Sequence, residues 1–356
     1  MAAAKQVKKI VNSLSCNPIC SKYPKYLSCH RSYSVKYPEK IKKEPKITCS
    51  CISVGCFSPH QVGEVKISVR VNGKHIKGSP YSVAASCDYT SLSKRPSKIV
   101  NNDGGMGELW GIGCSRNGKW AVADESNHCV YLYDGEDQLV RKIGGEGFNS
   151  GQLYWPRGVT FDDEDDLYVT DGHRVQKFTT DGDYLFGFGK VGSYDGQLKC
   201  PVGLTVHNDK VYIADFNNDH VSVFLIDGRF HQTIGRRQFG APCDVAVTSN
   251  DELLVVDWVD DCIYRYTLDG GYIGKLSDEL RQPESITIDS NGFILVADGG
   301  NHRVVILDKF GNLVHKFGSR GSGGGKFLSP YGIAVNKNGN VYVSDYHNKR
   351  VQIFCY

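Results

Sequence analysis

A short pattern recurs six times in the last two-thirds of this 356-residue chain and constrains its fold more than any other feature. Each copy has an apolar run that ends in Asp, a few polar residues and a second apolar run. The copies lie 41 to 47 residues apart, and their Asp residues are Asp124, Asp171, Asp215, Asp257, Asp298 and Asp345. A period of this length indicates an array of similar structural units rather than one irregular domain.

Each unit contains four short runs of β-forming residues joined by turns. In the fifth unit these runs span 284–289, 294–298, 303–308 and 312–318. The turns between them contain Asp, Asn and Gly, which adopt the backbone conformations that tight hairpins require. Four antiparallel strands in a unit of roughly 40 residues, repeated around an axis, are typical of a β-propeller. The sequence therefore predicts an all-β fold in which a six-bladed propeller occupies residues 96–356.

The sixth unit lacks a fourth run, and a segment ahead of the first unit has the right spacing to replace it. Ile99 stands ten residues before Leu109, as Phe317 stands ten residues before Phe327. We therefore expect residues 97–101 to form the outer strand of the sixth blade. This closure removes an open sheet edge, and we expect Ile99 to be buried, which contributes about 1.5–3 kcal/mol.

The first 48 residues are basic and show no regular hydrophobic period, so we expect them to be disordered. The cysteines in and after this region, with His30, raise the alternative of a zinc site. They are Cys16, Cys20, Cys29, Cys49, Cys51 and Cys56. Cys16 and Cys20 have the spacing of one pair of structural zinc ligands, but two such pairs are usual. Free thiols are favoured, so no metal or other cofactor is predicted.

A β-hairpin is predicted in the next segment. Apolar residues at 65, 67, 69 and 71 alternate with polar ones, and Asn72-Gly73 suits a tight turn. The stretch 57–81 resembles the end of a filamin-type immunoglobulin-like repeat and covers roughly a third of such a domain of about 100 residues. We therefore expect a partial filamin-type repeat at 50–84, followed by a polar linker at 85–95.

The units of the array resemble the NHL repeat. The namesake Asn-His pair of that repeat occurs at 127–128 and 301–302. The Gly near its start, two residues after Pro, is present as Gly158, Gly203 and Gly332. The resemblance covers about residues 94–356 and supports the prediction of a six-bladed NHL propeller.

A filamin-like segment followed by six NHL repeats resembles the C-terminal half of the tripartite-motif (TRIM-NHL) proteins. The resemblance implies a post-transcriptional or ubiquitin-linked regulator whose propeller selects RNA or protein targets, while an N-terminal RING carries ligase activity. This sequence shows no RING, B-box or coiled coil. Ubiquitin transfer by that route is therefore not expected of this chain.

Blade geometry sorts the loops of the array onto two faces. The turn after each repeat Asp emerges on the same face as the link into the next blade, and we name this the link face. The other hairpin turns emerge on the opposite side, which we name the hairpin face. Eleven hairpin-face turns between residues 116 and 339 hold 17 of the array's 35 acidic residues and 5 of its 27 basic ones, which predicts an acidic hairpin face.

The link face gathers the candidate binding residues. They are Trp110, Tyr154, Trp155, Arg157, Lys199, Phe216, Asn217, Trp258, Arg303, Tyr331, Tyr346, His347 and Lys349. Aromatic side chains interleaved with Arg and Lys stack on unpaired bases, and the same composition marks protein-binding hot spots. In the alternative interpretation several of them, notably Trp110 and Tyr331, pack between blades.

The six repeat Asp residues are expected to be structural and to accept backbone N–H bonds from the turn that follows each of them. His128, His173 and His302 share a position two residues before an apolar residue of the third run, and we expect them to be structural as well. Equivalent positions are spread around a ring, whereas metal ligands lie within about 2.0–2.2 Å of one ion. Neither a metal site nor a catalytic set is therefore predicted.

These features favour a non-catalytic recognition platform of the TRIM-NHL type. Its partners would be proteins, such as ubiquitination substrates or cytoskeletal cargo, and the array's charge of −8 (27 basic, 35 acidic) supports this. Single-stranded or stem-loop RNA is the alternative partner, and a metalloenzyme of the six-bladed class is a third, disfavoured function. No small-molecule substrate is expected. Thirteen cysteines without a secretory signal, and no long apolar run, predict a cytoplasmic protein that does not contact a membrane.

Overall fold

The computed structural model describes residues 95–101, 105–276 and 279–355, together with Tyr89, Leu92 and the backbone of four short strands between 64 and 84. The chain divides into two units, the first including residues 65–83 and the second residues 84–356. The predicted disorder of residues 1–48 and the zinc alternative fall outside the described residues.

Four short strands are described in the N-terminal part. They are β1 (Glu64–Ile67), β2 (Arg70–Val71), β3 (Lys74–His75) and β4 (Tyr81–Ala84). β1 pairs with β4, and β2 pairs antiparallel with β3 with Val71 opposite Lys74. The β-hairpin predicted around Asn72-Gly73 is thus confirmed, whereas the filamin-type repeat at 50–84 stays a prediction.

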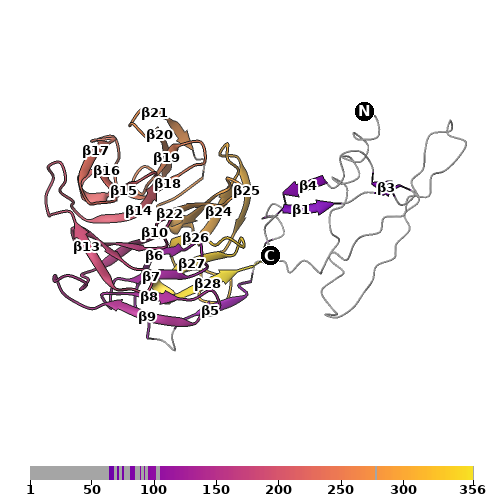
Figure 1. Ribbon diagram of the computed structural model, residues 1–356, viewed down its shortest axis with the longest axis horizontal. Coiled ribbons are helices and arrows are strands. Elements are labelled where there is room, and N and C mark those ends of the chain that lie inside the picture. The colour runs from indigo at the N-terminus through magenta and orange to yellow at the C-terminus, as the bar shows by residue number, and fades with distance from the viewer. Residues whose placement is uncertain are drawn as a thin grey trace, which may run out of the picture. The chain divides into compact units, whose positions relative to one another are not determined.

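Six four-stranded antiparallel sheets form the second unit, so the predicted six-bladed propeller is confirmed (Figure 1). Blade one contains β6 (Leu109–Cys114), β7 (Trp120–Asp124), β8 (Cys129–Tyr133) and β9 (Leu139–Gly144). Blade two contains β10 (Pro156–Phe161), β11 (Leu167–Asp171), β12 (Arg174–Phe178) and β13 (Tyr184–Phe188). Blade three contains β14 (Pro201–His207), β15 (Lys210–Asp215), β16 (His220–Leu225) and β17 (Phe230–Ile234).

The remaining three blades repeat this order. Blade four contains β18 (Pro242–Val247), β19 (Glu252–Asp257), β20 (Cys262–Thr267) and β21 (Tyr272–Leu276). Blade five contains β22 (Pro283–Ile288), β23 (Ile294–Asp298), β24 (Arg303–Leu307) and β25 (Leu313–Phe317). Blade six contains β26 (Pro330–Val335), β27 (Val341–Asp345), β28 (Arg350–Phe354) and β5 (Lys98–Val100). Three turns after a repeat Asp form short 3-10 helices, which are η3 (Phe216–Asn218), η4 (Gly299–Asn301) and η5 (Tyr346–Asn348).

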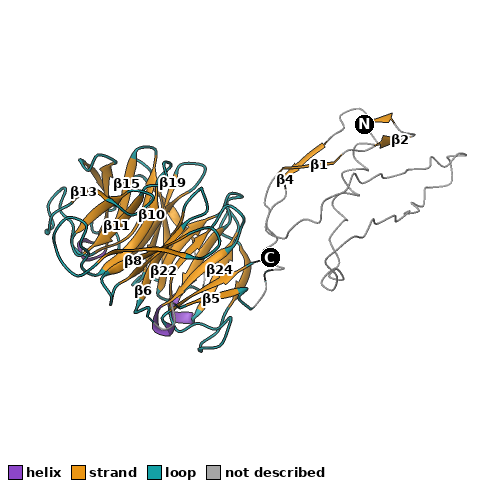
Figure 2. Cartoon of the chain, turned by 60° about the horizontal axis from the view of Figure 1, so that its bottom comes forward, coloured by secondary structure: helices purple, strands orange, loops and turns teal. Residues whose placement is uncertain are grey.

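Burial is greatest in the middle strands of each blade, whereas the first strands, which line the channel, are partly exposed. The second strands are covered by the neighbouring blades on both sides, so β7, β11, β23 and β27 are buried at every position. The outer strands are mostly exposed, and each buries an apolar residue near its end. These residues are Val100, Ile143, Phe188, Ile234, Leu276 and Phe317. Figure 2 shows the strands with the loops of the two faces at their ends.

The ring is closed by β5, which lies beside β28 with Val100 opposite Val351 and Ile99 opposite Gln352. The burial expected of Ile99 is wrong, since its side chain is 41% exposed while Val100 is 8% exposed. Successive residues of a strand point to opposite sides, and the side that faces blade one takes Val100. The closing strand therefore contributes Val100 to the core shared by blades six and one.

Part of the segment predicted as a linker belongs to the propeller. Tyr89 and Leu92 are 1% and 4% exposed and lie in the core cluster of blades five and six. The Tyr89 hydroxyl donates a hydrogen bond to Asp289 Oδ2 at 2.9 Å, and its ring packs edge-on against Phe293 at 5.2 Å. The composition of this segment is polar, but two of its apolar residues are buried beside a hairpin turn. We name Tyr89 and Leu92 the strap.

Candidate partner-binding face

The repeat Asp residues shape the link face, although by a different bond from the one expected. All six are at most 1% exposed. Each accepts a backbone N–H bond of 2.6–3.0 Å from the link that enters its own blade, sixteen or seventeen residues earlier. The donors are Gly107, Tyr154, Lys199, Gly240, Arg281 and Leu328. Backbone donors from the turn that follows are present only at Asp124 and Asp257 among the described residues.

The strand register explains this difference. Pro156 at the start of β10 pairs with Asp171 at the end of β11, so the link before β10 lies against the carboxylate. The same pairing recurs in the other blades, for example between Pro330 and Asp345. The repeat Asp thus fixes the link rather than the turn, and the links carry most of the candidate binding residues. Burial raises the pKa of Asp215 to about 7, against hydrogen bonds from Asn218 and Lys199.

Two of the three histidines hold neighbouring blades together, as expected for structural residues. His128 and His302 adopt left-handed backbone conformations, and their Nδ1 atoms accept N–H bonds from Trp155 at 3.1 Å and Ser329 at 3.0 Å. His173 does not share this place, because the turn of blade two is shorter and its left-handed residue is Gly172. His173 is exposed on the link face instead.

None of the thirteen candidate residues is fully buried. The exposed ones are Trp155, Lys199, Asn217, His347 and Lys349, and the other eight are half-buried. Arg303 is occupied within its own blade, since its guanidinium bonds to Asp298 Oδ2 at 2.6 Å and to the Glu279 carbonyl at 2.7 Å. Arg303 is therefore engaged within its own blade, whereas the five exposed residues are available to a partner.

Four of the half-buried residues form one cluster near the propeller axis. The Trp110 ring meets Tyr331 edge-on at 4.8 Å, and Tyr331 stacks on Tyr346 at 4.3 Å. The Arg157 guanidinium lies 4.7 Å from the Trp110 ring. Glu125 accepts hydrogen bonds from Trp110 Nε1 at 2.9 Å and from Arg157 Nε at 3.0 Å, so it compensates the Arg157 charge. We name Trp110, Arg157, Tyr331 and Tyr346 the axial cluster. These four side chains pack against one another across blade boundaries, as the alternative interpretation states for Trp110 and Tyr331.

Phe216 and Trp258 pack against the core of blades four and five. Trp258 also donates its indole N–H to Glu284 Oε1 at 3.0 Å. Glu284 is a residue that sequence analysis missed, and burial raises the pKa of its carboxyl to about 8. Glu284 is the second residue of the first strand of blade five, and other blades have Trp110, Arg157 and Tyr331 at this position. An acidic residue at a position where no other blade has one was the sequence signal that could have identified it.

Residues from four loops enclose a pocket of about 340 Å³ on the link face between blades two and three, which we name the link pocket. It is lined by Phe148, Tyr154, Trp155, Arg157, Gly172, His173, Cys200, Pro201 and Asn217. The pocket brings together four of the predicted residues, and a fifth, Lys199, is exposed next to Cys200 in the chain. Sequence analysis missed Phe148, although the corresponding position of two other links is occupied by Ser193 and Ser322.

The central channel is a second cavity, of about 210 Å³, lined by the first strands of all six blades. The first strands of neighbouring blades come closest together at four glycines, Gly111, Gly158, Gly203 and Gly332. A Cβ on Gly158, for example, would clash with the Val202 carbonyl. The corresponding residues of blades four and five are Asp244 and Ser285.

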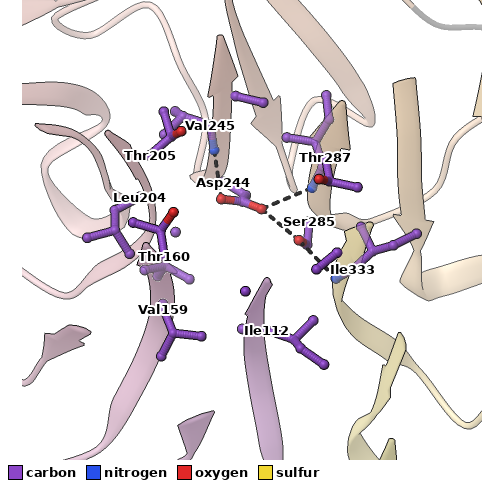
Figure 3. Close-up of a pocket in the computed structure, with 18 of the residues that line it drawn as sticks. Ile112, Val159, Thr160, Leu204, Thr205, Asp244, Val245, Ser285, Thr287 and Ile333 are labelled. Carbon is purple, nitrogen blue, oxygen red and sulfur yellow. Dashed lines mark hydrogen bonds between the residues drawn. The ribbon is translucent and has the colours of Figure 1, made fainter. Parts of the chain in front are cut away.

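Asp244 and Ser285 bond to each other across the blade boundary (Figure 3). Asp244 accepts hydrogen bonds from Ser285 Oγ at 2.6 Å, Ile286 N at 3.0 Å and Val245 N at 2.8 Å. Burial raises the pKa of Asp244 to about 6. This carboxylate is satisfied by the protein itself, and it joins two blades where the others use close backbone contact. Within the described part of the chain, no group of three or more His, Cys, Asp or Glu side chains could hold a metal ion.

On the hairpin face, blades two and three, with Arg116 of blade one, enclose an acidic pocket of about 260 Å³. We name it the hairpin pocket. Its lining includes Asp162, Asp163, Glu164 and Asp209, with Arg116 and Lys177 as cations. Lys177 Nζ lies 3.0 Å from both Asp162 and Asp166. Part of the acidic charge on this face is therefore neutralised by cations from adjacent strands and turns.

Comparisons with known proteins support the NHL resemblance. The NHL repeat family matches residues 280–307 and 327–354. "Protein brain tumor" of Drosophila melanogaster is 32% identical over 144 residues, which are 38% of this chain and 14% of that protein. "B-box type zinc finger protein ncl-1" of Caenorhabditis elegans is 28% identical over 143 residues, 38% of this chain and 17% of that protein. "E3 ubiquitin-protein ligase TRIM71" of Rattus norvegicus is 39% identical over 67 residues, 19% of this chain and 7% of that protein.

Solved structures share the propeller fold. A streptogramin B lyase superposes with a TM-score of 0.53 at 15% identity, covering 76% of this chain and 100% of the lyase. A gluconolactonase from Xanthomonas campestris superposes with a TM-score of 0.58 at 14% identity, covering 74% of this chain and 91% of that chain. At such identities the likeness concerns the fold alone. Among the described residues, none of the helices has the length and apolar character of a membrane-spanning segment.

Proposed function

We propose that this chain, whose C-terminal part carries NHL repeats homologous to those of TRIM-NHL proteins, is a non-catalytic platform that binds protein partners through its link face. The observation that carries the proposal is the link pocket, where two aromatic side chains of one link, Phe148 and Trp155, stand exposed beside an apolar hollow. Exposed aromatic residues next to a pocket are the usual anchors of protein interfaces. The repeat Asp bonds hold the links rigid, which lowers the entropy cost of binding.

The buried acids support binding rather than catalysis. Glu284 and Asp244 are the carboxylic acids that line the channel; burial raises the pKa of each, and each already accepts hydrogen bonds from the protein. The likeness to a lyase and a gluconolactonase rests on fold, which hosts unrelated functions.

RNA binding is the second candidate, favoured by the exposed cations Lys199 and Lys349 beside His347 on the same face as Trp155. Phosphate neutralisation makes such binding fall steeply with salt. The net charge of −8 over residues 94–356, from 27 basic and 35 acidic residues, favours protein partners over RNA. Since one similar protein is named an E3 ubiquitin-protein ligase, we place the partners among cytoplasmic ubiquitination substrates or cytoskeletal cargo.

A comparison of the two faces tests the proposal. One variant of the full chain carries Lys199→Glu, His347→Glu and Lys349→Asp on the link face. The last change is compatible with the left-handed backbone, because Asp219 and Asp261 occupy the equivalent position in blades three and four. The matched control carries Arg229→Glu, Lys309→Glu and Lys337→Glu on the hairpin face, where all three residues are exposed.

Quantitative capture of proteins from cell extract by wild type and both variants is the measurement. We expect a set of proteins that wild type and the hairpin-face variant retain and the link-face variant loses. Equal retention by both variants would contradict the use of the link face. A gel shift with random and structured RNA at two salt concentrations separates the second candidate, because submicromolar binding that weakens steeply with salt supports RNA instead.

A further inference from the structure

We infer that the link pocket binds an extended, acidic peptide segment of a partner protein, whose apolar side chain enters the pocket while a flanking carboxylate meets Lys199. The inference rests on the proposed function and deepens it, because it names one site on the link face and the chemistry of its occupant. Shape, charge and the position of Lys199 carry it together.

The pocket has the shape and lining of an anchor site. Its volume of about 340 Å³ is at the lower end of the roughly 300–1,000 Å³ of small-ligand sites, which suits one large side chain and adjoining backbone. Phe148 is 69% and Trp155 is 48% exposed, although both are large apolar groups. Burying them against a partner removes apolar surface from water, at about 25 cal/mol per Å².

The aromatic wall is already ordered without a partner. Tyr154 stacks on His128 at 5.2 Å and contacts Phe148 at 4.6 Å and Trp155 at 4.4 Å. The His128 Nδ1 atom accepts the Trp155 N–H bond, so the backbone at the rim is fixed by the preceding blade. A preformed wall of this kind binds without a large ordering cost.

The charge of the pocket selects an acidic occupant. No Asp or Glu lines it, in contrast to the hairpin pocket of the same two blades. Arg157 is compensated by Glu125, so it adds little net charge. Lys199 is exposed, and within the described part of the chain its ammonium makes no hydrogen bond or ion pair. Its backbone is held by Asp215 and by Asn217, a lining residue, so the Lys199 backbone lies beside the pocket.

The same features favour a peptide over a nucleotide base. A bound strand of RNA needs several cations along its phosphates, whereas this rim offers one free lysine and the exposed His173. The side-chain amide of Asn217, a lining residue, can hydrogen-bond a peptide backbone. One apolar anchor with one carboxylate beside it matches the exposed aromatic rings and Lys199.

A synthetic peptide library tests the inference on the full chain. Its members are end-blocked nonapeptides with a central Leu, Phe or Trp, flanked by Asp and Glu, by Lys and Arg, or by Ser and Gly. Fluorescence polarisation measures their affinity. We expect acid-flanked members to bind at least about tenfold tighter than the others, which corresponds to about 1.4 kcal/mol.

Two variants with matched controls locate the binding. Trp155→Ala should weaken acid-flanked peptides at least about tenfold, while Phe310→Ala, which removes a 71% exposed aromatic ring from the hairpin face, leaves them unchanged. Lys199→Glu should shift the preference to basic flanks, while Lys309→Glu on the hairpin face does not. Both pocket variants should melt as wild type does, because surface residues contribute little to stability.

Three outcomes would overturn the inference. The first is that no member of the library binds wild type, and the second is that binding ignores Trp155→Ala or that the flank preference survives Lys199→Glu. The third is that a heptauridylate probe binds, loses affinity in Trp155→Ala and weakens steeply with salt, which makes the site a base pocket. If partners still depend on the link-face triple variant but not on Trp155, the inference fails while the proposed function stands.

Discussion

The link pocket and the hairpin pocket lie between the same two blades but differ in chemistry. The first is aromatic and contains no carboxylate, whereas the second is lined by Asp162, Asp163, Glu164 and Asp209. Both are made of loops, so exposure alone does not explain the difference. The geometry of the loops does, because the two faces use carboxylates for different purposes.

Hairpin-face turns need a side-chain acceptor for their own backbone. Asp134 accepts N–H bonds from Glu136 at 2.9 Å and Gln138 at 2.8 Å, and Asp308 does the same with Phe310 and Asn312 at 2.9 Å. Short turns thus select Asp, Asn or Thr at a fixed place, and acidity accumulates as a result. The links are longer and tied down by a buried Asp outside their own sequence. Their exposed positions are therefore free to carry side chains that the turn itself does not need.

We expect the largest loss of stability on removing a buried repeat Asp, and a much smaller loss on removing an Asp from a hairpin-face turn. Asp345 is buried and bonds Leu328 N at 2.7 Å, Asn348 Nδ2 at 2.8 Å and Arg350 Nε at 2.9 Å. Asp345→Ala leaves a buried arginine unpaired and should cost about 3–5 kcal/mol. Asp308→Ala should cost about 1 kcal/mol. Urea unfolding measures both, and equal losses would break the distinction.

A smaller effect is expected where the strap meets the hairpin face. Tyr89→Phe removes the hydroxyl that bonds the buried Asp289 and should cost about 1–3 kcal/mol. Thermal unfolding of the full chain measures it, with Tyr194→Phe as control because that side chain is 81% exposed. If the two variants melt alike, the strap adds nothing to the stability of blade five.

The smallest effect concerns pH. Burial raises the pKa of Glu284 to about 8 from its ordinary value of about 4.5, while on the hairpin face a backbone bond from Arg229 lowers the pKa of Asp227. A raised folded pKa gives stability that is full below the unfolded pKa and is lost as the pH rises through about 8. The free energy of unfolding should therefore fall by about 1–2 kcal/mol between pH 5 and 9.

Glu284→Gln should remove much of that pH dependence, since an amide does not titrate. Asp227→Asn should leave it intact, because the lowered pKa of Asp227 lies below this window. Melting curves at pH 5, 7 and 9 make the comparison. A wild-type melting temperature that rises over this range would contradict the assignment.

How far the sequence predicts the site depends on the range of each interaction. Trp155 precedes a first strand, Arg157 is the second residue of that strand and Asn217 follows a repeat Asp, so their face follows from strand alternation. Phe148 and Cys200 needed the closed ring, because they meet only when two links from neighbouring blades converge. The same reason hid Asp244 and Ser285, which are 41 residues apart and bond across a blade boundary.

The sequence by itself determined the all-β class, the number of blades and the division into two faces, because a repeated period and local turn chemistry decide these. Only the tertiary structure decided which way each repeat Asp bonds, that Val100 rather than Ile99 is buried, and that the strap belongs to the core. It also decided which link residues meet in one pocket. Strand formation depends on neighbours a few residues away in the chain. These contacts depend instead on how the blades pack around the axis, and a local sequence pattern does not specify contacts between residues so far apart in the chain.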